Sequence, residues 1–408
     1  MPIAYCQLTI SRWPTNNETQ HLYLYPNLIL NLNLNLHLNL NLNSTALPLP
    51  LFLRTISLLQ FKNYHQRSFE FSDRIVGICG NNGVGKTSLL DAIHYLCFTK
   101  SYFTRDSINV QQGKSGFRIE GRFELQDKPE KAVCVLRETG KKEFSVNDQV
   151  YEKFSHHIGH YPCVIIAPDD AQLITGGSEE RRKFIDSLLS QIDAEYLQCL
   201  ITYTKVLQQR NSLLKTMSET GQKDFALLDV LDEQLCKPGE YIFSKRKEFL
   251  VSFLPVTKHL YQEIAKQPED ISLFYESELL QANFKELLAV TRQRDTYAQR
   301  TTSGIHRDDL EITLGNQTFR NIASQGQRKS LLFALKLAEM EVLKKEKHFA
   351  PLLLLDDVFE KLDEERISNL LQKVCLENEG QVFITDTNEV RLREHLEAIN
   401  TPYQMIVI

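Results

Sequence analysis

The sequence predicts an α/β fold with an antiparallel β-subdomain and an inserted helical subdomain, and three observations support it. Short apolar runs of strand length alternate with stretches of helical periodicity, at 74–79, 164–167, 352–355, 381–385 and 404–407. Alternating segments separated by turn residues are typical of an antiparallel sheet, and they occur at 117–125, 132–138 and 143–146. Residues 179–268 have apolar positions at three- and four-residue spacing, which indicates helices.

Changes in these patterns predict the domain boundaries. The chain has 408 residues, enough for two or three packed units. We assign 51–175 to the N-terminal part of the α/β lobe, 176–270 to the helical insertion, and 271–408 to the C-terminal part of the lobe.

Residues 1–50 differ from the rest of the chain. From Asn31 to Asn43 the sequence alternates Asn and Leu, with His37 as the one exception. We interpret the segment as a low-complexity, disordered extension, and an extra edge strand or a sorting tail is the alternative.

The elements before the helical insertion follow in order. Strands are expected at 53–59 and 67–71 on either side of a turn at 61–64. A buried strand at 164–167 is stopped by Pro168.

The helical insertion has its own start and break signals. Ser178 is expected to cap its first helix, because acidic residues fill the following turn. Gly221 and Pro238-Gly239 are expected to interrupt the helices.

The remaining elements return to strand and helix alternation. Strands are expected at 271–275 and 310–314, and helices at 279–300, 364–375, 388–398 and from near Gly326.

The most specific motif is an octapeptide between an apolar strand and a helical stretch. It reads Gly80-Asn81-Asn82-Gly83-Val84-Gly85-Lys86-Thr87, the G-x-x-x-x-G-K-T pattern of a phosphate-binding loop. Its glycines let backbone N–H groups surround a phosphate, and the helix dipole favours the anion. We expect Lys86 to contact the β- and γ-phosphates of ATP and Thr87 to bind Mg²⁺.

A second motif is the acidic pair Asp356-Asp357, which follows four consecutive leucines. The acids therefore stand at the carboxyl end of a buried strand, where open α/β sheets bind ligands. We expect Asp356 to hold Mg²⁺, directly or through water, and Asp357 to orient or deprotonate the attacking water. A solvated acid pair is the alternative reading.

A third motif opens a long helix with Ser324-Gln325-Gly326-Gln327. Ser and Gly at a helix N-terminus can bind an anion. One subunit does not need two triphosphate sites, so we expect Ser324, Gly326 and Gln327 to contact the γ-phosphate held by a second subunit. An ordinary helix cap is the alternative.

Composition limits the classes of partner. The net charge is −5, so any DNA contact must come from local basic patches. Two basic runs, Arg181-Arg182-Lys183 and Lys245-Arg246-Lys247, are candidates for such contact, with solvated surface as the alternative.

Cysteine usage and hydropathy point to the cytoplasm. The eight cysteines are single residues without a CxxC pair, which argues against a structural zinc site and for a reducing cytosol. Beyond residue 50 no apolar run approaches the roughly 20 residues that span a bilayer, so we expect no membrane association.

The three motifs, in this order, resemble those of ABC-type ATPases of the SMC kind, and the RecF family of DNA replication and repair proteins in particular. Further blocks of that family are matched by Asn63-Tyr64, by Asp169-Asp170 after Pro168, by 181–186 and by 304–309. The resemblance covers 51–408 and omits 1–50. It departs from the family at 360–363, where Glu-Lys-Leu-Asp replaces a Ser-Glu-Leu-Asp-like run, and at Ile305, where Pro is usual.

The resemblance implies an ABC/SMC-type ATPase head that binds ATP and Mg²⁺, hydrolyses ATP slowly and forms an ATP-dependent homodimer. It also implies binding to single-stranded DNA and gapped duplex, and cooperation with RecO and RecR in loading RecA. Lys86 and Asp357 are the implied catalytic residues.

Three other functions share parts of this pattern. One is an ATPase subunit of another SMC/ABC-type system, including a transporter, whose helical insertion is usually shorter. Another is an SMC-type nuclease partner, which needs far more coiled coil than this chain has room for. The third is a P-loop kinase, which has no use for the Ser324 motif.

Overall fold

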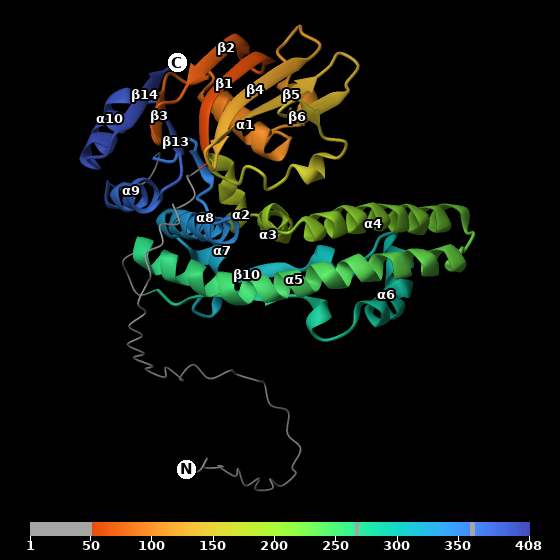
Figure 1. The fold of residues 1–408 in the computed structure, drawn as a ribbon. Coiled ribbons are helices and arrows are strands. Elements are labelled where there is room, and N and C mark those ends of the chain that lie inside the picture. The colour runs from red at the N-terminus through yellow and green to blue at the C-terminus, as the bar shows by residue number, and fades with distance from the viewer. Residues whose placement is uncertain (1–50, 266–268, 360–363) are drawn as a thin grey trace, which may run out of the picture. The chain divides into compact units, whose positions relative to one another are not determined.

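Five parallel strands form the central sheet of the computed structural model, which describes residues 51–265, 269–359 and 364–408 (Figure 1). The strand order is β14-β3-β13-β12-β8. The strands are β3 (Ile75–Cys79), β8 (Cys163–Ile166), β12 (Leu352–Leu355), β13 (Val382–Asp386) and β14 (Tyr403–Val407). This arrangement confirms the predicted α/β sheet. The expected extension at 1–50 and the departure at 360–363 lie outside the described residues.

Successive residues of the central strands face two different hydrophobic cores. Leu353 and Leu355 belong to one core and Leu352 and Leu354 to the other, because side chains alternate across a strand. A sheet covered on both faces needs apolar residues at every position, which explains the unbroken leucine run.

Helix α1 (Lys86–Phe98) fills the core on one face of the central sheet, together with an antiparallel sheet. The strand order of that sheet is β2-β1-β4-β5-β6-β7. Its strands are β1 (Phe52–Phe61), β2 (Tyr64–Glu70), β4 (Phe117–Leu125), β5 (Lys128–Leu136), β6 (Lys142–Val146) and β7 (Gln149–Val150). The predicted antiparallel β-subdomain is therefore present, and the two strands before the phosphate loop belong to it.

Helices supply most of the opposite core. They include α2 (Ala171–Thr175), α3 (Ser178–Ile192), α4 (Ala194–Thr220), α5 (Phe225–Ala265), α8 (Gln325–Lys347), α9 (Glu364–Leu371) and α10 (Glu389–Ala398). Six π-helical residues, Gln372–Glu377, follow α9. Figure 1 shows α4 and α5 as two long helices side by side. We call α4, α5 and α6 (Phe284–Ala298), which packs against both, the helical arm.

Two expectations about the helical insertion are wrong. Helix α5 continues through Pro238 and Gly239 instead of breaking there, and both residues are buried. A Cβ on Gly239 would lie 2.4 Å from the ring of Phe284, so the glycine allows the close approach of α6. Ser178 is the first residue of α3 rather than its cap, and Gly177 occupies the cap position without a side-chain hydrogen bond.

Strands expected in the main α/β alternation form a separate antiparallel sheet of three strands. Its order is β11-β10-β9, with β9 (Ile271–Glu276), β10 (Asp309–Leu314) and β11 (Gln317–Thr318). Strand β9 packs against α5 and β10 against α3, so tertiary contact with the helices decides their place. The expected helix at 279–300 is a 3-10 turn, Glu278–Leu280, followed by α6. A short helix α7 (Phe319–Ile322) leads to α8.

Candidate functional site

The phosphate loop joins the end of β3 at Cys79 to the start of α1 at Lys86, as expected. Two of its glycines are required by geometry. Gly83 and Gly85 have φ angles of 82° and 117°, in the region that side chains disfavour. A Cβ on Gly85 would also lie 2.8 Å from the hydroxyl of Tyr64, whereas the space around Gly83 is open.

Lys86 is 4% exposed and curls back over the loop. Its ammonium donates hydrogen bonds to the backbone carbonyls of Gly80 at 2.8 Å and Asn81 at 3.2 Å. The charge is thus held inside the ring of the loop, next to the N-terminus of α1. A phosphate there would meet both a cation and the positive end of a helix dipole.

Thr87 and Asp356, far apart in the sequence, meet at this end of the central sheet. The hydroxyl of Thr87 donates to the carboxylate of Asp356, with oxygen distances of 2.9 and 3.1 Å. Leu355 pairs with Ile166 on one side and Ile384 on the other, so Asp356 is level with Thr385. The Thr385 hydroxyl donates to the same carboxylate at 2.9 Å. Burial raises the pKa of Asp356 above its usual value, although both hydroxyls oppose that shift.

The hydroxyl of Thr87 and the carboxylate of Asp356 are ligands suited to Mg²⁺. The described residues hold no cluster of three or more His, Cys, Asp or Glu side chains that could bind a metal without other help. Mg²⁺ commonly takes one or two protein oxygens and completes its shell with phosphate and water. The donors present fit an ion bound in that way.

Asp357 follows Asp356 with a φ of 45°, unusual for a residue other than glycine. Its backbone N–H donates to the Thr385 hydroxyl at 2.9 Å, which fixes the turn out of β12. The residue is partly exposed at the same end of the sheet. Thr385 therefore orients both acids, a role that sequence reasoning missed. Its only signal was its place at the end of the neighbouring apolar run.

Ser324, Gly326 and Gln327 lie at the start of α8, as expected. Ser324 caps the helix, because its hydroxyl accepts from the Gln327 N–H at 3.2 Å and the Gln327 side chain accepts from the Ser324 N–H at 2.8 Å. A Cβ on Gly326 would lie 2.3 Å from the Arg366 guanidinium. These side chains bond one another rather than the phosphate loop of their own chain.

Each of the two basic runs proposed for DNA contact contains one buried arginine. Arg181 is 7% exposed and forms two hydrogen bonds to Asp309, at 2.7 and 2.9 Å. Arg246 is 2% exposed and pairs with Asp186 and Asp308. Burial in ion pairs removes both arginines from the surface. Of the same runs, Lys183 and Lys247 are exposed, and Lys245 is partly exposed and lies 3.6 Å from the carboxylate of Asp193.

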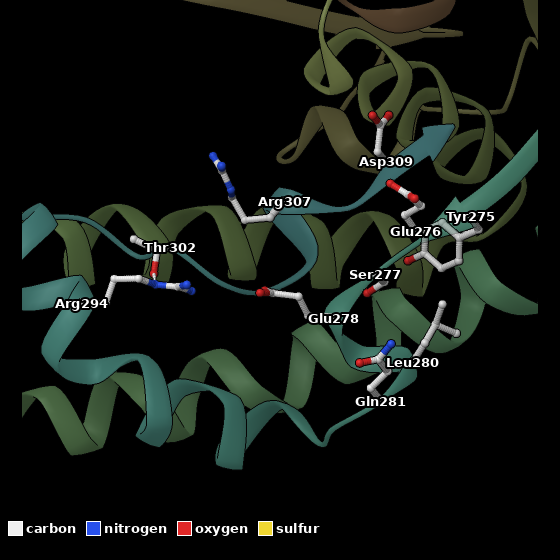
Figure 2. Close-up of a pocket in the computed structure, with 10 residues that line it drawn as sticks. All are labelled: Tyr275, Glu276, Ser277, Glu278, Leu280, Gln281, Arg294, Thr302, Arg307 and Asp309. Carbon is white, nitrogen blue, oxygen red and sulfur yellow. Dashed lines mark hydrogen bonds between the residues drawn. The ribbon is translucent and has the colours of Figure 1, made fainter. Parts of the chain in front are cut away.

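A cavity of about 620 Å³ lies among β9, β10 and α6, away from the phosphate loop (Figure 2). Its lining includes Arg307 and Asp309, from the block at 304–309 that matched the family. None of the phosphate-loop residues lines it, so it is separate from the candidate nucleotide site.

Comparison with known proteins agrees with these features. The family model for the RecF/RecN/SMC N terminal domain matches residues 52–405. Two proteins named "DNA replication and repair protein RecF" are 42% identical to this chain. The one from Flavobacterium johnsoniae aligns over 86% of this chain and 99% of its own length. The one from Parabacteroides distasonis aligns over 87% and 96%.

A solved structure of the recombination mediator protein RecF with ATP, described as part of the RecFOR pathway, matches with a TM-score of 0.78 at 30% identity. The match covers 85% of this chain and 94% of that one. None of the described helices combines the length and apolarity that crossing a membrane requires. With an ABC/SMC-type head fold and relatives of this similarity over most of its length, the chain belongs to the RecF family of DNA replication and repair proteins.

Proposed function

We propose that this chain is an ATP-dependent DNA-binding protein of recombinational repair and replication in the cytoplasm. The observation that carries the proposal is the convergence of Lys86, Thr87 and Asp356. A buried ammonium inside the phosphate loop stands beside a hydroxyl and carboxylate 2.9 Å apart. That combination suits a nucleoside triphosphate with its magnesium ion.

Each residue of this site has a separate proposed role in nucleotide binding. The backbone N–H groups of the loop bind phosphate oxygens, and Lys86 neutralises charge on the β- and γ-phosphates. Thr87 and Asp356 hold Mg²⁺, which when bound neutralises charge that develops during hydrolysis. Asp357 orients the attacking water or accepts its proton, and we expect slow turnover, which suits a switch more than a metabolic enzyme.

ATP is proposed to join two copies of the chain. Ser324 is exposed at the start of α8, so a neighbouring subunit's nucleotide can reach it. Gly326 contributes its backbone to the contact with that nucleotide, and the Ser324 and Gln327 side chains add hydrogen-bond donors. ATP then favours the dimer, and loss of the γ-phosphate releases it.

The proposed DNA partners are single-stranded DNA and gapped duplex, and the proposed protein partners are RecO- and RecR-like mediators that load RecA. Contacts from lysine to phosphate carry no base information, so binding should be independent of sequence. Lys183 and Lys247 remain the exposed candidates from the two basic runs, and Lys245 is a partly exposed one.

Sedimentation with ATP tests the shared site. Ser324→Arg places bulk and charge in the closed interface, so nucleotide should still bind while dimerisation and hydrolysis fall. Asp357→Asn should bind ATP, hydrolyse it slowly and accumulate as a dimer on DNA. A Ser324→Arg protein that dimerises and hydrolyses ATP normally would refute the model. Gel shifts on gapped DNA with and without ATP separate this function from that of another SMC/ABC-type ATPase subunit.

A further inference from the structure

Three consecutive residues at the turn from β1 into β2, Lys62, Asn63 and Tyr64, contact the phosphate loop or its helix. The amide nitrogen of Asn63 donates to the Gly83 carbonyl at 2.7 Å, and its amide oxygen accepts from the Ser88 hydroxyl at 3.3 Å. The hydroxyl of Tyr64 donates at 3.0 Å to the Gly85 carbonyl, which also accepts from the Leu89 N–H of α1 at 2.9 Å. The sequence brings this turn to the loop from about twenty positions upstream.

The two carbonyls held by the turn determine where the next N–H groups point. In a trans peptide the C=O and the following N–H point in opposite directions. Holding the Gly83 carbonyl toward Asn63 therefore turns the Val84 N–H away from the turn and into the loop. Holding the Gly85 carbonyl does the same for the Lys86 N–H. A phosphate-binding loop needs these donors to converge before the ligand arrives.

The Tyr64 ring also fits against the backbone of Gly85. It is 5% exposed, and its hydroxyl would lie 2.8 Å from a Cβ at Gly85. Burial raises the pKa of Tyr64 to about 12, so its hydroxyl stays protonated as a donor at neutral pH.

Lys62 fastens the same turn to α1. Its ammonium lies 2.5 Å from the carboxylate of Asp91, which is fully buried. That carboxylate also accepts from the Ser101 hydroxyl at 2.6 Å and the Tyr102 N–H at 2.8 Å. The turn is thus fixed to the helix that begins with Lys86 and Thr87, and it moves with that helix.

We propose that Asn63 and Tyr64 are positioning residues that preorganise the phosphate loop of this chain by holding two of its carbonyls outward. They set nucleotide affinity without touching the nucleotide. The proposal rests on the proposed function, in which the loop binds ATP. It also makes the β1–β2 hairpin a mechanical link between the antiparallel sheet and the nucleotide.

Nucleotide titration of two variants tests this role. Asn63→Ala and Tyr64→Phe each remove one hydrogen bond to a loop carbonyl, so each should weaken ATP and ADP binding by about fivefold. The KM for ATP should rise by a similar factor while kcat changes little, because Lys86 and Asp357 are untouched. The double variant should be weaker than either.

Two controls separate positioning from general stability. His65→Ala alters the next residue on the hairpin, which is exposed and bonds the Gln111 side chain, and it should leave affinity unchanged. Ser88→Ala removes only the longer Asn63 contact and should have a smaller effect than Asn63→Ala. Wild-type affinity in both test variants, or an equal loss in His65→Ala, would overturn the proposal.

Amide hydrogen exchange distinguishes failure of this inference from failure of the proposed function. In protein without nucleotide, Asn63→Ala and Tyr64→Phe should speed exchange across residues 80–87, and His65→Ala should not. That readout does not depend on ATP. If wild-type protein and Lys86→Ala bind ATP equally poorly, the proposed function fails, and unchanged exchange would independently reject the positioning role.

Discussion

Two regions of the molecule bury a cationic side chain to a similar extent but treat its charge differently. In the phosphate loop, Lys86 is 4% exposed, and its ammonium bonds two neutral carbonyls. In the helical arm, Arg246 is 2% exposed, and its guanidinium pairs with two carboxylates, those of Asp186 and Asp308. Within the described residues, no carboxylate comes within 4.0 Å of the Lys86 ammonium. Its charge still acts on Asp356, where it opposes the rise in pKa that burial causes.

Whether a buried cation has a carboxylate partner within the chain indicates whether it is suited to bind an external anion. Burying a charge is costly unless a partner of opposite charge compensates it. Arg246 has its partners within the chain, so its role is to hold α5 against α3 and the turn before β10. Lys86 has no carboxylate partner within 4.0 Å among the described residues, and a bound anion such as phosphate would supply the compensating charge. Arg210, a second buried arginine of the helical arm, likewise pairs with two carboxylates, those of Asp232 and Asp295.

The largest expected effect is on the stability of the arm. Arg246→Ala leaves Asp186 and Asp308 without their cation, and breaking a buried ion pair costs about 3–5 kcal/mol. The free energy of unfolding, measured in urea, should fall by that amount. Lys247→Ala, at an exposed neighbour on the same helix, is the control and should change it little. Unchanged stability with a loss of DNA binding would instead make Arg246 a surface contact.

Lys86→Ala should show the opposite pattern. Loss of a charged hydrogen bond to phosphate should weaken ATP affinity by about 10- to 100-fold, as seen by titration. Unfolding free energy without nucleotide should stay the same or rise slightly, because an uncompensated buried charge is removed. Lys86→Arg should not restore function, since the planar guanidinium is not an equivalent point charge. A large loss of stability without nucleotide would break the comparison.

Another buried cation, Lys336 on α8, provides a pH test. It lies 3.6 Å from Glu339 and 3.8 Å from Asp170. Burial raises the pKa of Glu339 from 4.5 to about 7, against the attraction of Lys336. A raised carboxyl pKa means that the folded protein binds the extra proton, so this stability is present below pH 4.5 and is lost as pH rises to about 7.

The unfolding free energy should therefore fall between these pH values, by up to about 3 kcal/mol at roughly 1.4 kcal/mol per pKa unit. Glu339→Gln, which cannot ionise, should flatten that part of the profile while other carboxyls continue to titrate. An unchanged slope in Glu339→Gln would show that Lys336 keeps Glu339 ionised throughout.

The smallest expected effect on stability is at Lys183, two residues after Arg181. Lys183 is exposed and pairs with Glu179 and Glu180, each at 2.9 Å. Exposed ion pairs contribute little, so Lys183→Ala should change unfolding free energy by less than about 0.5 kcal/mol. A loss of DNA affinity in this variant, with a shallower salt dependence, would then report a phosphate contact. If Lys183→Ala lowered the unfolding free energy by several kcal/mol, the contrast between exposed Lys183 and buried Arg181 would be wrong.

The phosphate loop could be predicted from the sequence because its motif is a run of consecutive residues. Its glycines, lysine and threonine must be consecutive for one turn of backbone to surround a phosphate, so spacing alone identifies them. The acidic pair and the cap at Ser324 were also readable, since each stands at the end of one element. The alternation of strands and helices was sufficient for the fold class and most strands of both large sheets.

Other features depend on residues distant in the chain. Pro238-Gly239 predicts the end of a helix from sequence alone. In the structure α5 continues through it, and Gly239 leaves the space that the ring of Phe284 occupies. Strands β9 and β10 look like members of the main sheet, and only their contact with the helices places them in another.

The sequence by itself determined the phosphate loop, the acidic strand end and the α/β class, because short-range backbone geometry and hydrophobic periodicity encode them. Only the tertiary structure decided which basic residues stay at the surface. Arg181 and Lys183 belong to one run, yet Asp309 on a distant strand buries the first and leaves the second in solvent. A charge is buried or exposed according to partners that folding brings together, and sequence spacing does not record them.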